Sequence, residues 1–151
     1  MRATLLLCDH AVVAEGKLYI SGAGWSVTGP DPAPSAIALK LDVPWDLTNQ
    51  PIEIRLRLVT EDGAPVLQAG PAGPSPIEVV ARLEVGRPVG VPAGSPIDAP
   101  LAVNLPALPL APGSRYSWVL EIDGEHEADW HLAFSTRPAP APPGSATALP
   151  Q

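Results

Sequence analysis

Three side chains of metal-binding type lie close together near the end of the chain: His126, Asp129 and His131. Imidazole nitrogens and carboxylate oxygens are common ligands of zinc. Asp129 and His131 are two residues apart, so on a strand both point to one face, and His126 lies in the adjoining loop. A solvated turn explains this stretch equally well, and no other Cys/His cluster completes a site. We keep the three as candidate metal ligands, but predict no metal and no other cofactor.

Cys8 and His10 form a second pair that could do chemistry, because an imidazole can activate a thiol as a nucleophile. A reactive thiol needs a positive, partly exposed setting, whereas the apolar run Leu5–Leu7 just before Cys8 predicts burial. The sequence contains no nucleophile elbow, His-Glu-x-x-His helix or phosphate-binding loop. We therefore predict that the protein is not an enzyme.

Aromatic residues offer a third possibility, a surface for a ligand or partner. Trp25 follows a glycine-rich strand end, and Trp45 stands beside Asp46 in the loop VPWDLTNQP. Together with Tyr19 they could form a platform at one rim of a β-sandwich, on which a sugar ring would stack. Alternatively, the tryptophans plug the end of the sandwich and keep its core dry. Trp118 and Trp130 fall in apolar rows and are predicted to be core residues.

Composition limits the fold that must position these residues. The chain of 151 residues contains 21 prolines, which leave little room for long helices but are tolerated between strands and at sheet edges. Its formal net charge of −7 disfavours nucleic acid as a partner. No apolar run is long enough to cross a bilayer, and we predict no membrane association.

The start of the chain, MRATLLLCDH, invites comparison with a lipoprotein signal, but the apolar run between Arg2 and Cys8 is too short for one. We expect a first strand there. With one cysteine no internal disulfide can form, so the fold does not need an oxidising compartment. We predict a cytoplasmic protein.

Apolar and polar residues alternate along several stretches, as expected for strands with one buried face. The clearest are 37–43, 52–58, 77–85, 116–122 and 130–134, each with its apolar row inward. With the opening run, GKLYIS and LAVNLP, they predict about eight strands. The favoured fold is an all-β, antiparallel two-sheet β-sandwich, with a closed or partly open barrel as the alternative. The domain is predicted to span residues 2–136, followed by a disordered, Pro/Ala-rich tail over 137–151.

Three motifs carry a resemblance: GKLYISGAGW, VPWDLTNQPIEIRLRLVTEDG and PGSRYSW. The sequence resembles an uncharacterised family of small bacterial single-domain β proteins over most of residues 3–135. The resemblance implies a β fold and a bacterial cytosol, and attaches no activity, cofactor or catalytic residue.

The function predicted from these observations is that of a non-catalytic protein acting through protein–protein contacts or self-assembly. A protein partner or a homo-oligomer is expected. The alternative is a small-ligand binding module, for carbohydrate as one example, that uses Tyr19, Trp25, Trp45 and Asp46 at a rim.

Overall fold

The computed structural model describes residues 1–144, so the part of the predicted tail at 145–151 lies outside the described residues. Residues 1–144 contain eleven strands and one short 3₁₀ turn, η1 (Trp45–Leu47). The strands are β1 (Arg2–Ala14), β2 (Lys17–Ala23), β3 (Val27–Thr28), β4 (Ser35–Val43), β5 (Pro51–Thr60), β6 (Leu67–Gln68), β7 (Ser75–Pro76), β8 (Glu78–Glu84), β9 (Ile97–Leu105), β10 (Arg115–Ile122) and β11 (His131–Thr136). The eight longer strands are the eight that the sequence predicts; β3, β6 and β7 have two residues each.

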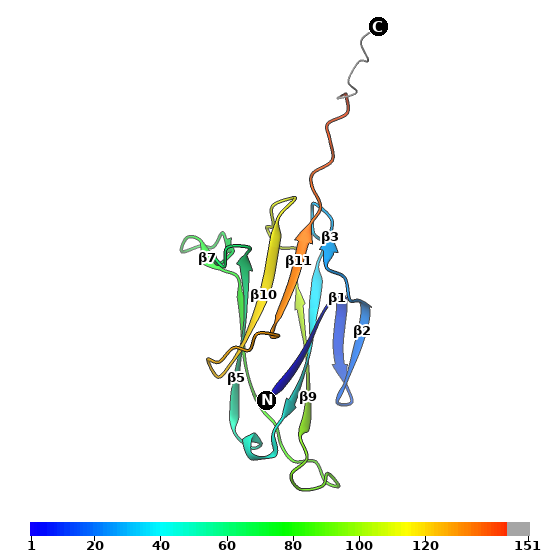
Figure 1. The fold of residues 1–151 in the computed structure, drawn as a ribbon, viewed down its shortest axis with the longest axis vertical. Helices are drawn as coiled ribbons and strands as arrows, with labels where there is room; N and C mark the ends of the chain where they lie inside the picture. The colour runs from blue at the N-terminus through cyan, green and yellow to red at the C-terminus, as the bar shows by residue number, and fades with distance from the viewer. Residues whose placement is uncertain (145–151) are drawn as a thin grey trace.

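The longer strands form two sheets (Figure 1). Sheet A has the order β2-β1-β4-β9 and is antiparallel throughout, whereas sheet B has the order β3-β11-β10-β5-β8. One pair in sheet B departs from the predicted antiparallel arrangement, because the short β3 runs parallel to the end of β11. No ladder joins the two sheets within residues 1–144, which agrees with the predicted sandwich.

The main core lies between the sheets and is built from the predicted inward rows. Ile37, Leu39 and Leu41 of β4 are fully buried, and Trp118 and Leu120 of β10 cover them from sheet B. Each fully buried side chain of this size stabilises the fold by about 1.5–3 kcal/mol. Trp130 is also buried, so both tryptophans predicted to be core residues belong to the core.

Strand β1 is shared between two partners. Its first half, Arg2 to Cys8, pairs with β4, and its second half, from Cys8 to Ala14, pairs with β2. Figure 1 shows the strand folding back, so that its second half and β2 form a hairpin beside the main body. We call residues 9–23 the arm. At its tip, Glu15 and Gly16 both have positive φ, as a two-residue type I′ turn requires.

The arm covers a second, smaller cluster of apolar side chains. Cys8 and Ala11 of β1 are fully buried, and they pack with Ala36 and Ala38, which are neighbours of the inward row of β4. Small side chains allow the two layers to approach closely. This cluster lies on the face of sheet A away from the main core, because Ala36 and Ala38 alternate with the inward residues.

Strand β11 ends at Thr136, and residues 137–144 are exposed. Figure 1 shows the chain leaving the body of the molecule after β11. The division into a 2–136 domain and a tail stays a prediction. None of the helical segments described is long and apolar enough to cross a membrane.

Candidate functional site

The aromatic residues proposed for a ligand platform lie far apart. Trp25 lines a small cavity with Ser35, the first residue of β4, whereas Trp45 follows the end of β4 by two residues. A nine-residue strand is about 26 Å long, so the two tryptophans occupy opposite ends of the sandwich. Tyr19 lies on β2, in the arm. The structure therefore does not assemble the platform that the sequence suggested.

Each tryptophan is instead held by its own neighbours. The ring of Trp25 packs edge-on against Phe134, with centroids 6.3 Å apart, and both rings contact the main core. The guanidinium carbon of Arg87 lies 4.2 Å from the ring centroid of Trp45, close enough for a cation–π contact. Arg87 also donates to the Trp45 carbonyl at 2.9 Å. Asp46 beside it is exposed. Contacts of this kind are expected of tryptophans that close the two ends of the sandwich.

The candidate metal ligands are engaged separately. Nδ1 of His126 donates to the carbonyl of Leu120 at 2.8 Å, and Nδ1 of His131 donates to the carbonyl of Ala128 at 2.8 Å. Asp129 is exposed. In the described range no three His, Cys, Asp or Glu side chains are grouped as a metal site requires. The structure thus does not bring His126, Asp129 and His131 together as ligands.

The Cys8 thiol lies in an apolar setting. Cys8 is fully buried, and its Sγ–H points to the carbonyl of Ala36 at 3.5 Å. Burial raises the pKa of this thiol, which disfavours the thiolate that a nucleophile needs. His10 is exposed and donates from Nδ1 to Oδ1 of Asn104 at 3.0 Å. The imidazole is thus engaged with a carboxamide.

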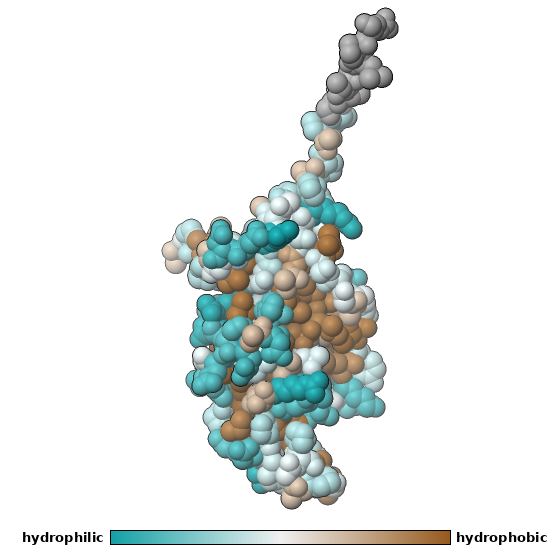
Figure 2. Space-filling model, in the orientation of Figure 1, coloured by the Kyte–Doolittle hydropathy of each residue, from teal (hydrophilic) through white to brown (hydrophobic). Residues whose placement is uncertain are grey.

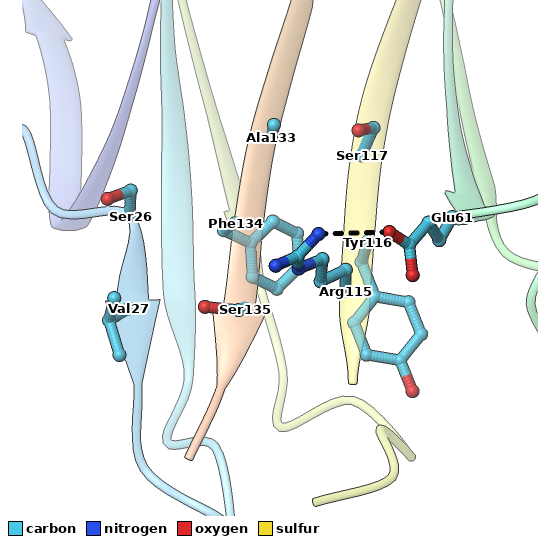
Figure 3. A pocket seen from close by; sticks show the side chains of 9 residues that line it. All are labelled: Ser26, Val27, Glu61, Arg115, Tyr116, Ser117, Ala133, Phe134 and Ser135. Atoms are coloured by element: carbon cyan, nitrogen blue, oxygen red, sulfur yellow. Dashed lines mark hydrogen bonds and ion pairs between the residues drawn. The ribbon is translucent and has the colours of Figure 1, made fainter. Parts of the chain in front are cut away.

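The outer face of sheet B carries a shallow hollow of about 360 Å³, shown in Figure 3. It arises because small side chains stand opposite one another, Ser117 facing Ala133 across β10 and β11. Arg115 stands at its rim, and its guanidinium donates to Glu61 at 3.0 Å, the contact dashed in Figure 3. The charges at the rim therefore neutralise each other.

Exposed apolar side chains gather on the arm and the start of β1. Ten large hydrophobic residues within 1–144 are exposed, and half of them lie on β1 or β2: Leu6, Val12, Val13, Tyr19 and Ile20. Figure 2 shows a brown area in this region, between β11 and the arm. Tyr19 is 51% exposed and Val12 47%, and the two face each other across the hairpin. Val12 and Tyr19 lie on one face of the arm, and Val13 and Ile20 on the other. Exposed apolar side chains gathered on one element indicate an interaction site more strongly than scattered ones do.

The side chain of Asn104, on β9, hydrogen-bonds to the backbone of the arm. Nδ2 of Asn104 donates to the carbonyl of Ala11 at 2.8 Å, and the Ala11 N–H donates back to Oδ1 of Asn104 at 3.3 Å. The carboxamide thus satisfies both backbone groups of a buried residue, as a neighbouring strand would. Ala11 and Leu18 pack beneath the arm against Ala36 and Ala38. The arm is therefore an ordered part of the fold.

The second edge of the arm lies along β2, which is the terminal strand of sheet A. Ala14 and Lys17 flank the two-residue turn, so they form a hydrogen-bonded pair, and pairs of this type recur at every second residue. Tyr19 and Ser21 therefore direct their backbone groups to β1. Leu18 and Ile20 direct theirs to the opposite edge, where the described part of the chain supplies no hydrogen-bond partner.

Tyr19 was a candidate from the sequence, whereas the arm as a unit was not predicted. A usable signal was present, because Val12-Val13 and Leu18-Tyr19-Ile20 are apolar on both faces, whereas a strand with one wet face alternates. The hydrogen bonds between Asn104 and the backbone of Ala11 could not have been predicted, since 93 residues separate the two.

Comparison with protein families gives a match over most of the chain. A family of unknown function (DUF6941) matches residues 3–135. The chain belongs to this family. The match confirms the resemblance expected from the motifs, and it runs from β1 into β11, so it includes the arm. No curated protein and no solved structure matches the chain.

Proposed function

We propose that this protein is a non-catalytic interaction module of the cytosol, and that the arm is its contact surface. The observation that carries the proposal is the coincidence, on one hairpin, of exposed apolar side chains and an edge open for pairing. Exposed apolar area gives affinity, and open backbone groups give a partner strand a defined register. Both features are costly on a protein that contacts nothing, because such edges promote aggregation.

The other surfaces support this choice by their chemistry. The outward face of sheet B is charged with both signs, and its ions are paired: Arg55 with Glu78 at 3.1 Å, and Arg57 with Glu121. Paired, mixed charges of this kind typify a solvated wall. The Cys8 thiol is buried, and the hollow beside Arg115 holds a neutralised ion pair, so neither favours catalysis.

The experiment is a capture assay with the tagged full-length chain in a lysate of the native host. The arm variant is the double substitution Val12→Ser and Tyr19→Ser, which removes exposed apolar area. Its matched control is Val80→Ser, because Val80 is 48% exposed but lies on β8, in the other sheet.

We expect the wild-type chain and Val80→Ser to retain the same bound protein, a second copy included, and the arm variant to lose it. Circular dichroism of all three would show that each folds. An arm variant that folds and retains the same bound protein would refute the proposal, and so would a wild-type chain that binds no protein at all.

A further inference from the structure

We infer that the partner of the arm is a second copy of this chain, joined to the first by antiparallel pairing of β2 with β2. This inference rests on the proposed function and specifies its partner. Two such arms would form a continuous four-stranded sheet with the order β1-β2-β2-β1, related by a two-fold axis perpendicular to the sheet.

The four terminal strands of the two sheets differ in how well they are protected against such pairing. Strand β9 contains Pro100, which lacks a backbone donor. Strand β8 carries Glu78, Arg82 and Glu84, all exposed. Strand β3 is two residues long. Charge, proline and shortness are the usual protections of a sheet edge.

Strand β2 has little of this protection. Six of its seven residues are exposed, and Lys17 is the charged one. Gly22, near its end, has a φ of +61°, so the regular part of the edge runs from Lys17 to Ser21. Among the terminal strands, this is the edge that the chain leaves open to another strand.

The hydrogen bonding of the arm determines the register. Leu18 and Ile20 direct their backbone groups outward, so they must supply the bonds between copies. A two-fold axis through Tyr19 places Leu18 of each copy opposite Ile20 of the other, and each such pair exchanges two hydrogen bonds. This register uses the regular part of β2 and leaves out Gly22.

The same register matches the side chains. The two Tyr19 side chains meet at the axis as a non-hydrogen-bonded pair, in which opposite side chains lie closest. Val12 is the neighbour of Tyr19 within each arm, so an apolar row Val12-Tyr19-Tyr19-Val12 crosses the joined sheet. Lys17 stands opposite Ser21 of the second copy, and no like charges meet. The strand is complementary to itself.

The test is charge substitution at the axis, read by sedimentation velocity of the purified full-length chain from about 1 to about 100 μM, the range in which moderate complexes dissociate. Tyr19→Lys and Tyr19→Glu each place like charges opposite one another in the dimer. An equimolar mixture of the two places opposite charges there. Val80→Lys is the matched control on β8. Circular dichroism checks that every variant folds.

We expect the wild-type chain and Val80→Lys to dimerise. Each Tyr19 variant alone should be shifted at least tenfold toward monomer, and the mixture should recover dimer. Rescue by the mixture is a result that only pairing of Tyr19 with itself produces. A monomeric wild-type chain, or a dimer that Tyr19→Lys leaves intact, overturns the inference. A monomer whose arm still captures a different protein would leave the proposed function standing and overturn self-pairing alone.

Discussion

The side chain of Asn104 pairs with both backbone groups of Ala11, although the two residues lie on different strands and 93 positions apart. Ala11 is fully buried, so its N–H and C=O have no access to solvent. The carboxamide replaces a neighbouring strand for one residue and holds the arm against sheet A. Because the arm is held in this way, the open edge of β2 has a defined position relative to sheet A.

Replacing Asn104 with alanine should loosen the arm without unfolding the domain. Two buried backbone groups would lose their partners, at a cost of about 1–3 kcal/mol. Cys8 lies beneath the arm, so its thiol reports opening. We expect the rate of Cys8 labelling by a thiol reagent under native conditions to rise about tenfold or more, since 1.4 kcal/mol corresponds to a factor of ten. Val80→Ser should leave the labelling rate unchanged. An unaltered rate in Asn104→Ala would show that the hydrogen bonds of Asn104 to Ala11 do not hold the arm in place.

Gly22→Ala should destabilise the protein by about 1–2 kcal/mol, because an L residue is strained at this φ of +61°. The added Cβ would also clash with the side-chain carboxylate of Asp9, which must rotate away. Urea denaturation measures the loss. Combining the change with Asp9→Ala removes the clash and leaves the backbone strain. Gly86→Ala is the control, since its φ is ordinary and a Cβ there meets open space; a cost equal to that of the control would rule out the strain.

Tyr19→Cys should give a disulfide-linked dimer under mild oxidation. In the proposed register the two Cα atoms at the axis are about 4.5 Å apart, within the range that a disulfide spans. Non-reducing electrophoresis would detect the linked dimer. Cys8 is buried and should not interfere. Val80→Cys should stay monomeric on the same gel, and equal cross-linking of the two variants would indicate random collision.

Lys40 should contribute to stability in a pH-dependent way. Asp42 and Asp98 face each other across β4 and β9, and Lys40 bridges them at 2.6 and 2.9 Å. The hydrogen bond from Lys40 lowers the pKa of Asp42 below its ordinary 3.8, and the bonds to Asp42 and Asp98 raise the pKa of Lys40 above its ordinary 10.5.

A lowered carboxyl pKa gives stability that is present above pH 3.8 and lost as the pH falls below it. A raised amine pKa gives stability that is present below pH 10.5 and lost as the pH rises past it. Lys40→Ala should therefore cost at most about 1 kcal/mol at pH 7, since the pair is partly exposed to solvent. Urea midpoints of both proteins should converge near pH 2–3, and a constant difference at all pH values would exclude the ion pairs as its source.

Deleting residues 139–151 should leave the stability within about 0.5 kcal/mol of the full chain. Two bonds that fix the end of the domain remain: Arg137 donates to Thr28, and Gly113 donates to Arg137, both at 3.0 Å. Residues 139–144 are exposed. Thermal unfolding of both chains measures the difference. A clear drop on truncation would mean that the tail packs on the domain, against the predicted boundary near residue 136.

The strands and their buried rows could be predicted because they follow from local pattern. Alternation from Ile37 to Val43 and from Tyr116 to Ile122 decides which face of each strand is apolar, and both rows are buried as expected. A tight turn at Glu61-Asp62-Gly63 also follows from local sequence, because Asp-Gly is a favoured turn pair. The Thr60 N–H donates to the Ala64 carbonyl across this turn. The candidate sites could not be predicted in the same way. His126 and His131 are close in sequence, but each bonds to a different backbone carbonyl, and they do not form a shared metal site.

The amino-acid sequence by itself determined the all-β class, the eight main strands and the residues of the main core, because the period of two is a property of each strand alone. Only the tertiary structure decided that Trp25 and Trp45 lie at opposite ends, that Asn104 meets Ala11, and that β2 is a terminal strand. Those relations depend on the order in which strands pair, and pairing joins residues far apart in the chain. An open edge is defined by which strands are absent beside it, and no local pattern of residues encodes that.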